Sequence, residues 1–356
     1  MRILHVITSL RIGGAERLVS ELLPHFRKRG IEVELALFDS TPSAFLSNLE
    51  SEGIRIHKLG TGYRSMYNPL HILKLRNLIS GFDIVHTHNS SCQLFTAIAN
   101  RLNARKTHLV TTEHNTSNRR RKWNWYRVID HFMYDCYEKI ISCSIETEKE
   151  FIHTFGEYKS KITTIPNGIN LSACSSASPT FTPSHQVIAM VAAFRPQKDH
   201  ITAIKAIAML PGNYHLYFAG DGVLMDSVKE FTKSMHLSHR VHFLGNVTDV
   251  AGIFKSADCA LLSTHHEGLP LSAIEAMASG TPLIASDVAG VTELVSSAGI
   301  LVPPADEKAL ADAIERVITD HELRASLIKS GLDRASGFSI ESTAKQYIDL
   351  YSSILT

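Results

Sequence analysis

The sequence predicts an α/β protein that consists of two doubly wound parallel-sheet domains in tandem. Its 356 residues suffice for two domains of roughly 150 residues each. Short apolar runs rich in β-branched residues alternate with amphipathic helical patterns along the chain, which favours parallel sheets with helices on both faces. The alternation breaks once, at residues 172–183, where Ser, Thr, Ala and Pro dominate without periodicity. This stretch predicts a linker.

Before the break, the pattern predicts a Rossmann-like domain over residues 1–171. Amphipathic stretches between its apolar runs predict helices at 15–29, 69–80 and 145–155. The runs themselves predict strands at 3–8, 32–38, 54–57, 84–88, 109–112, 139–142 and 162–165.

After the break, the alternation restarts and predicts a second Rossmann-like domain over residues 184–339. Late helices are expected at 307–318, 321–335 and 341–354. The strands are expected at 187–191, 216–219, 241–244, 259–262, 283–285 and 300–302. Such sheets bind ligands beyond the carboxyl ends of their strands, so two of them facing each other predict a cleft.

Composition narrows the class of protein. Residues 1–170 hold 23 Lys/Arg and 16 Asp/Glu, whereas residues 171–356 hold 13 and 19, so the halves have opposite charge. The five cysteines have no metal-ligand or redox spacing, which favours a reducing, cytoplasmic compartment. Met1 leads into an apolar strand rather than a signal peptide, and no apolar run approaches the roughly 20 residues of a membrane span.

Three strand-to-helix turns are rich in glycine. They contain Gly13-Gly14-Ala15-Glu16, Gly220-Asp221-Gly222 and Glu267-Gly268-Leu269-Pro270. Each can aim backbone amides and a helix N-terminus at an anion. In any one of these turns, the glycines also fit a purely structural role in an α/β turn without ligand binding. None completes G-x-G-x-x-G, so no nicotinamide cofactor is indicated.

The third turn has further signals. Pro270 suits the start of a helix and Gly280 its end, so a short helix is expected at 271–279. Glu275 lies within this apolar helix, where an unpaired carboxylate would be costly to bury. A pair of ligand hydroxyls would satisfy it, and so would exposure to solvent or pairing with an arginine.

Two cations follow the first strand of the second domain. Arg195 and Lys198 lie on a turn at its carboxyl end, where they could neutralise a diphosphate. A solvated surface pair is the commoner role of such residues.

The ordered set of these motifs resembles the retaining glycosyltransferases of the GT-B fold, glycosyltransferase family 4, of the bacterial surface-polysaccharide type. The resemblance covers the whole chain and is most specific around Glu267 and Glu275. The further matching motifs are Gly13 to Glu16, His86-Thr87-His88, Thr112-Glu113-His114-Asn115, Ile165 to Ile169, Arg195 with Lys198, Gly220 to Gly222, and Ser286 to Gly290. The residues around Arg195 differ from the common family pattern, but the spacing from Arg195 to Lys198 is kept.

The resemblance implies a role for each of these residues. Arg195 and Lys198 would stabilise the leaving diphosphate, with Glu267 beside the donor sugar and His114 touching that sugar from the first domain. The implied donor-binding residues are Gly14, Gly220, Gly222, Gly268, Leu269, Pro270, Leu271 and Glu275. The implied acceptor-side residues are Glu16, His86 and His88. In this family the last helix returns to the first domain, which implies the same for residues 340–356.

The implied reaction moves a hexose or N-acetylhexosamine from a nucleotide-diphosphate sugar, UDP-sugar favoured, to a lipid-linked or polysaccharide glycan. No Asp-x-Asp occurs in the chain, so we expect a metal-independent enzyme without a cofactor, in which cations and amides stabilise the departing phosphate. The resemblance implies front-face substitution with retention of the anomeric configuration. No second carboxylate for a double displacement is evident, so the departing phosphate oxygen would take the proton of the acceptor.

Residues 119–127 form a basic and aromatic cluster, Arg-Arg-Arg-Lys-Trp-Asn-Trp-Tyr-Arg. The cluster predicts peripheral contact with an anionic membrane surface, which would suit a lipid-linked acceptor. It equally fits a solvated helix start with inward aromatics. No nucleic-acid-binding motif accompanies it, so no nucleic-acid partner is expected.

Two other readings share this architecture. A sugar-nucleotide epimerase would release nucleotide without an acceptor. A non-catalytic, membrane-associated glycan-binding protein would keep the fold without turnover, which the presence of Glu267, Glu275, Arg195 and Lys198 argues against.

Overall fold

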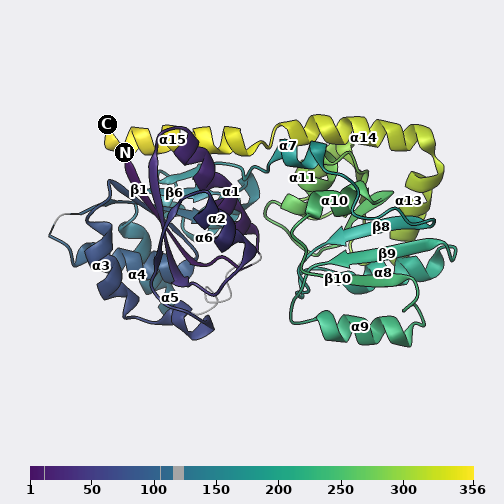
Figure 1. The fold of residues 1–356 in the computed structure, drawn as a ribbon, viewed down its shortest axis with the longest axis horizontal. Helices are drawn as coiled ribbons and strands as arrows, with labels where there is room; N and C mark the ends of the chain where they lie inside the picture. The colour runs from purple at the N-terminus through teal and green to yellow at the C-terminus, as the bar shows by residue number, and fades with distance from the viewer. Residues whose placement is uncertain (12, 105, 115–123) are drawn as a thin grey trace. The chain divides into compact units, whose positions relative to one another are not determined.

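The computed structural model describes residues 1–11, 13–104, 106–114 and 124–356. Its contacts divide the chain into two compact units. The N-terminal unit comprises Met1–Gly168 together with Ile340–Thr356, and the C-terminal unit comprises Ile169–Ser339. Figure 1 shows both units as a parallel sheet covered by helices.

The N-terminal unit contains a seven-stranded parallel sheet in the order β3-β2-β1-β4-β5-β6-β7. The order reverses direction beside β1, as in doubly wound folds, where ligands bind at such switch points. The strands are β1 (Arg2–Ser9), β2 (Glu32–Asp39), β3 (Arg55–Lys58), β4 (Ile84–His88), β5 (His108–Glu113), β6 (Lys139–Ser142) and β7 (Ile162–Thr164).

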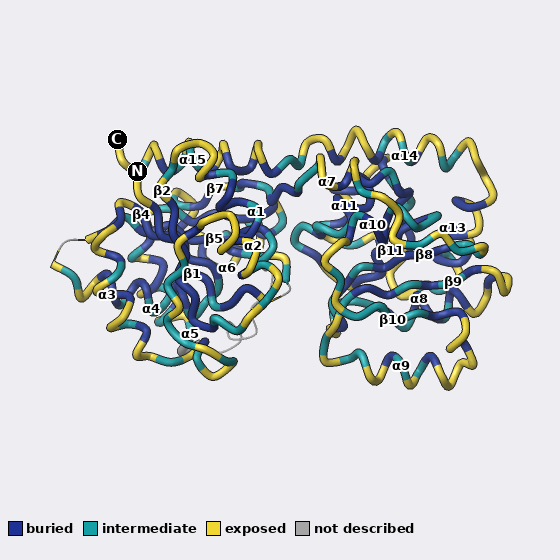
Figure 2. Tube along the Cα trace, viewed as in Figure 1, coloured by how far each residue is buried: buried dark blue, intermediate teal, exposed yellow. Residues whose placement is uncertain are grey.

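Helices cover both faces of this sheet, and each face has its own apolar core. One core includes side chains of α1, α2 and α15, and the other includes side chains of α3 to α6. The helices are α1 (Gly14–Lys28), α2 (Ala44–Ser51), α3 (His71–Ile79), α4 (Ser90–Arg101), α5 (Asn124–Asp135), α6 (Ile145–Thr154) and α15 (Ile340–Leu355), with 3-10 turns η1 (Tyr63–Tyr67) and η3 (Gly156–Tyr158). Because both faces are covered, the central strands are buried throughout, as Figure 2 shows in dark blue.

The C-terminal unit contains a six-stranded parallel sheet in the order β10-β9-β8-β11-β12-β13. Its strands are β8 (Gln186–Val191), β9 (Tyr214–Ala219), β10 (Val241–Gly245), β11 (Cys259–Leu262), β12 (Leu283–Ser286) and β13 (Ile300–Val302). Every predicted strand therefore exists within two residues of its expected bounds.

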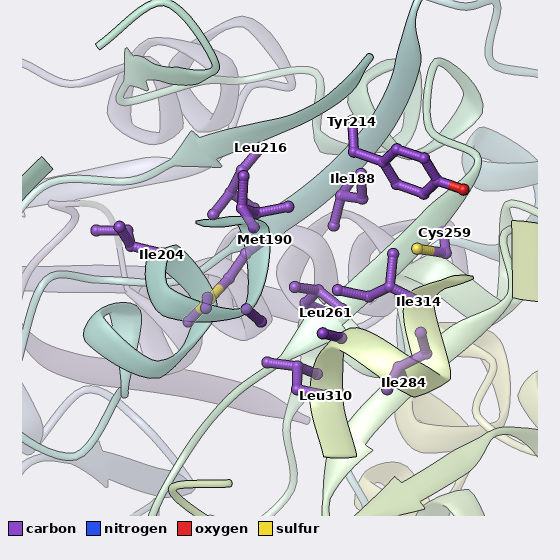
Figure 3. Packing of buried hydrophobic residues seen from close by; sticks show 14 of the residues in the cluster. Ile188, Met190, Ile204, Tyr214, Leu216, Cys259, Leu261, Ile284, Leu310 and Ile314 are labelled. Atoms are coloured by element: carbon purple, nitrogen blue, oxygen red, sulfur yellow. The ribbon is translucent and has the colours of Figure 1, made fainter. Parts of the chain in front are cut away.

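Two cores also flank the second sheet. Figure 3 shows the one in which Met190 and Leu261 of the sheet pack with Leu310 and Ile314 of α13. The helices of this unit are α7 (Leu171–Ser176), α8 (His200–Met209), α9 (Met225–Ser234), α10 (Val250–Lys255), α11 (Leu271–Ala278), α12 (Thr292–Val295), α13 (Glu307–Thr319) and α14 (His321–Ser336), with the 3-10 turn η4 (Ser296–Ala298).

The predicted linker at 172–183 is wrong in its first half, because α7 begins there. Asn170 caps this helix by accepting from the amide of Ala173, and Cys174 is buried in the core beside α11. The helix is too short to show a helical periodicity of apolar residues, so its Ser-rich composition predicted a linker instead.

The last helix, α15, belongs to the N-terminal unit. Its residues Ile340, Ala344, Tyr347 and Tyr351 are buried in the core that α1 also lines. Among the described residues, no helix is long and apolar enough to cross a membrane.

Candidate functional site

The C-terminal unit places Lys198 and Glu267 in direct contact. The Lys198 ammonium forms an ion pair with Glu267 Oε1, and their side chains are 12% and 8% exposed. Thr264 Oγ1 donates to the same carboxylate oxygen at 2.8 Å. Lys198 follows β8 and Glu267 follows β11, so both lie beyond the carboxyl ends of neighbouring strands, where α/β sheets bind ligands.

Local hydrogen bonds fix the two loops that carry this pair. Lys198 and Thr264 form an isolated antiparallel bridge, and the Asp199 amide donates to the Ser263 carbonyl at 3.0 Å. Asp199 also caps α8 by accepting from the Thr202 amide at 3.0 Å. These bonds therefore fix the backbone of Lys198, and Glu267 holds its ammonium.

Two glycines let neighbouring loops approach closely. Gly220 has φ +143°, and a Cβ there would lie 2.1 Å from the Ala192 carbonyl oxygen. Gly290 has φ +78°, and its Cβ would lie 2.2 Å from the carbonyl oxygen of Glu267. Neither position accommodates another residue without a backbone shift. The predicted donor residue Gly222 lies on the same turn as Gly220, and its Cβ would meet the Phe194 carbonyl oxygen at 2.5 Å.

The predicted short helix is present as α11. Pro270 is its N-cap residue, and Gly280, with φ +72°, follows its end, as expected. The segment of Gly268, Leu269, Pro270 and Leu271 leads into it, so the first amides of the helix lie after Glu267. Such an N-terminus carries partial positive charge and suits an anionic ligand.

Glu275 lies within α11 and is 3% exposed. The alternative that this carboxylate faces solvent is therefore wrong. Arg195, in contrast, is exposed on the turn after β8, and its carbonyl accepts from the Lys198 amide at 2.9 Å. The two predicted cations share one turn but differ in environment, since only Lys198 is held by a carboxylate.

The N-terminal unit contains a separate cluster of histidines. His114 Nε2 lies 3.0 Å from His88 Nδ1, and His88 Nε2 lies 3.0 Å from His5 Nδ1. His86 bonds Thr112 Oγ1 at 2.7 Å and the Tyr351 hydroxyl of α15. The predicted His86, His88 and His114 thus lie together, in a row of imidazoles that His5 extends.

Burial keeps these imidazoles neutral. It lowers the pKa of His5 to about 3 and the pKa of His114 to about 4. Burial, reinforced by the neighbouring histidines, also lowers the pKa of His86 and His88 well below the usual value. A neutral imidazole both donates and accepts, so the row can fix the tautomer of His114. His114 Nδ1 has no hydrogen-bond partner among the described residues.

The predicted N-terminal loop leads into α1. Gly13 precedes the helix with extended backbone, Gly14 begins it, and Glu16 lies in its first turn. A Cβ at Gly14 would meet nothing within 4 Å, so the space beside this residue is open within the described part of the unit. Of the basic segment, residues 119–123 lie outside the described residues, and Arg127 is exposed on α5.

Sequence reasoning missed His5, Thr264 and Tyr351. His5 is fully buried in a strand with apolar neighbours, and a polar residue in such a strand was an available signal. Thr264 and Tyr351 gave no signal, because their partners lie far away in sequence.

Comparison with known proteins places both units among glycosyltransferases. Residues 12–173 match the family described as Glycosyltransferase Family 4, and residues 176–334 match Glycosyl transferases group 1. The putative glycosyltransferase EpsF of Bacillus subtilis is 27% identical over 320 residues, which cover 83% of this chain and 81% of EpsF. An Escherichia coli UDP-Gal:alpha-D-GlcNAc-diphosphoundecaprenol alpha-1,3-galactosyltransferase is 28% identical over 291 residues, covering 76% of this chain and 75% of that protein.

Solved structures share the fold. Anabaena Alr3699/HepE in complex with UDP-glucose superposes with a TM-score of 0.85 at 23% identity, covering 99% of this chain and 100% of that one. WaaG, a glycosyltransferase involved in lipopolysaccharide biosynthesis, superposes with a TM-score of 0.75 at 15% identity, covering 98% and 99%. Two glycosyltransferase family models match the two parallel-sheet units in order, and the solved structures share the fold. This chain is therefore a family 4-like glycosyltransferase of the GT-B fold.

Proposed function

We propose that this glycosyltransferase moves a hexose or N-acetylhexosamine from a UDP-sugar to a lipid-linked glycan, with retention of anomeric configuration and without a metal ion. The observation that carries the proposal is the buried Lys198–Glu267 pair beside the N-terminus of α11. A fixed cation and helix amides together suit a diphosphate that leaves during transfer.

The proposed chemistry follows from where charge develops. As the bond from the anomeric carbon to the phosphate oxygen breaks, charge builds on the diphosphate, and Lys198 and Arg195 would stabilise it. The sugar becomes oxocarbenium-like. In front-face substitution, the departing phosphate oxygen takes the proton of the acceptor hydroxyl, so that the proton and the electron pair end on UDP.

The remaining residues would position the donor. Glu275 would accept from the ribose hydroxyls, and Gly220 and Gly222 would admit the nucleotide close to the backbone. His114 would contact the transferred sugar through Nδ1. These roles are supported by the resemblance and by the burial of Glu275.

A lipid-linked acceptor is supported by the E. coli relative, whose name specifies a diphosphoundecaprenol-linked substrate. It is also supported by an exposed apolar and basic patch, which we call the η1–α3 patch. Tyr63, Tyr67, Leu70 and Leu73 are each more than half exposed there. The exposed cations of the same stretch are Arg64, Lys74 and Arg76. Aromatic and aliphatic side chains among cations suit an anionic membrane on the cytoplasmic side.

The test is nucleotide release with defined donors. Purified protein is incubated with UDP-glucose, UDP-galactose and their N-acetyl forms, with and without an undecaprenyl-diphosphate-linked sugar, in EDTA. We expect UDP release that depends on the acceptor and an α-linked product by NMR. Release of UDP without acceptor would instead indicate an epimerase or a hydrolase. No UDP release with any pair of donor and acceptor would indicate a protein that binds these ligands without turnover. A β-linked product would overturn retention.

A further inference from the structure

Three histidines outside the donor site meet at one end of the second sheet. His185 precedes β8, His215 is the second residue of β9, and His242 is the second residue of β10. These strands are neighbours in the order β10-β9-β8, so the three residues lie at the amino ends of consecutive strands. All three are partly exposed, which leaves a route for a ligand from solvent.

The imidazoles are close enough to share one ion. A nitrogen from each of the three lies within 4.8 Å of the other two. His215 Nδ1 and His242 Nε2 are 3.0 Å apart, and the rings of His185 and His215 stack with centroids 3.7 Å apart. Two nitrogens bound tetrahedrally to Zn²⁺ at 2.0–2.1 Å are about 3.3 Å apart. The two hydrogen-bonded nitrogens are thus already close to the spacing of a bound pair. An ion would replace this hydrogen bond and would require the stacked rings of His185 and His215 to turn toward it.

The strands bring the three rings together on one side of the sheet. His215 and Tyr217 alternate with buried Tyr214, Leu216 and Phe218 along β9, so both face the same side of the sheet. The Tyr217 hydroxyl lies 2.9 Å from His185 Nε2. An outer partner of this kind orients a metal-binding imidazole. The tyrosine in turn stacks on Phe181, with ring centroids 4.7 Å apart.

We propose that His185, His215 and His242 bind one transition-metal ion, with Zn²⁺ as the physiological class, and that this ion ties together the amino ends of β8, β9 and β10. Imidazole donors without carboxylates select Zn²⁺, Cu²⁺ or Ni²⁺ over Mg²⁺ and Ca²⁺. Three protein ligands leave one position for water.

This site is separate from the donor site. His215 is near the start of β9, and Gly220 follows its end. Five residues of strand at about 3.3 Å each separate them by about 16 Å. The ion would therefore stabilise the unit without touching the diphosphate, and the inference stands independently of the proposed function. The proposed ion concerns the fold alone, and the metal-independent reaction stays a prediction.

The spacing explains why no motif revealed the site. The three histidines are 30 and 27 residues apart in sequence, and each lies at the start of a different strand. A second group, His5, His86 and His88, also has nitrogens within 4.8 Å. Those side chains are fully buried, whereas the three histidines of the proposed site are partly exposed. A metal ion therefore has no comparable route from solvent to His5, His86 and His88.

The experiment titrates ZnCl₂ into full-length, chelator-stripped protein by calorimetry and by thermal unfolding. We expect one Zn²⁺ per chain and a rise of about 5–10 °C in unfolding temperature at 100 times the Kd. His242→Gln and His185→Gln should each weaken Zn²⁺ binding by about 10–100-fold. His321→Gln, which changes an exposed histidine of α14, is the matched control and should bind Zn²⁺ as wild type does.

A second readout locates the ion directly. Cu²⁺ bound to the wild-type protein should show electron spin-echo modulation from imidazole nitrogens, and His242→Gln should lose part of it. Equal Zn²⁺ affinity in wild type and both variants would overturn the proposal. Loss of binding in His5→Asn but not in His242→Gln would also overturn it, because the ion would then lie in the buried cluster. Each variant's circular dichroism verifies that it folds.

Discussion

Lys198 and Glu267 form a buried ion pair although 69 positions separate them, and Thr264 donates to the same carboxylate oxygen at 2.8 Å. A carboxylate that already holds the ammonium keeps it oriented before substrate binds. Preorganised charge of this kind acts in the transition state without further reorganisation.

Lys198→Ala should reduce kcat about a hundredfold or more while changing donor KM little. One charge-stabilising donor in a transition state contributes roughly 3 kcal/mol. Steady-state kinetics with varied UDP-sugar measures the two constants. Lys205→Ala, which removes a half-exposed lysine from α8, is the control and should leave both unchanged. An equal kcat for Lys198→Ala and wild type would remove Lys198 from the mechanism.

Glu275→Ala should weaken UDP binding about 10–100-fold, since a hydrogen bond to a charged group contributes about 1.5–3 kcal/mol. Calorimetry with UDP measures the affinity, and Glu322→Ala on the exposed side of α14 is the matched control. The pyrimidine alone should bind both proteins alike, since it lacks the ribose hydroxyls. Unchanged UDP affinity would show that Glu275 has no ribose role.

Gly290→Ala should destabilise the C-terminal unit by about 1–3 kcal/mol, because the position has φ +78° and its Cβ would strike the Glu267 carbonyl. The shift should displace Glu267 and lower kcat/KM for the donor. Gly212→Ala, where a Cβ meets nothing within 4 Å, is the control. Urea unfolding and donor kinetics measure the two effects, and a fully active, stable Gly290→Ala protein would contradict the close approach.

The buried histidines should make stability depend on pH below neutrality. Their pKa is lowered in the folded protein, to about 3 for His5 and about 4 for His114, whereas the unfolded value is 6.5. Between these values the unfolded chain binds more protons, so stability is full above pH 6.5 and falls as the pH drops towards 4. Each such histidine contributes about 1.4 kcal/mol per pH unit.

Urea unfolding at pH 7, 6 and 5 checks this dependence. His5→Asn keeps an amide near the position of Nδ1 but cannot titrate, so its stability should fall less steeply with acid than that of wild type. His321→Gln, at an exposed site on α14, should keep the wild-type slope. Parallel slopes for wild type and His5→Asn would mean that His5 is not protected from protonation.

The η1–α3 patch should bind anionic membranes. Tyr67 and Leu70 are 61% and 59% exposed beside three cations, so Tyr67→Ser with Leu70→Ser should reduce flotation with phosphatidylglycerol vesicles several-fold. High salt should weaken the wild-type interaction. Val223→Ser, which removes a side chain 87% exposed in the C-terminal unit, is the control. Equal flotation of all three proteins would exclude this patch as the contact.

The sequence alone determined the elements and their class. Apolar runs such as 259–262 and 283–285 coincide with β11 and with most of β12, since strands covered on both faces are largely apolar. Pro270 and Gly280 gave the limits of α11, because proline suits the start of a helix and glycine tolerates the positive φ that often follows its end. The prediction of a linker was wrong at its Ser-rich start, because α7 is too short to show the periodicity of a helix.

Only the tertiary structure decided which side chains meet. The contacts of Lys198 with Glu267, of His5 with His88, and of His185 with His215 and His242 all depend on strand order, which brings residues distant in sequence onto neighbouring strands or the loops beside them. Local preferences act over a few residues and set helix and strand. Which side chains contact each other depends on the strand order, which the crossover connections between parallel strands set. No local pattern in the chain encodes this strand order.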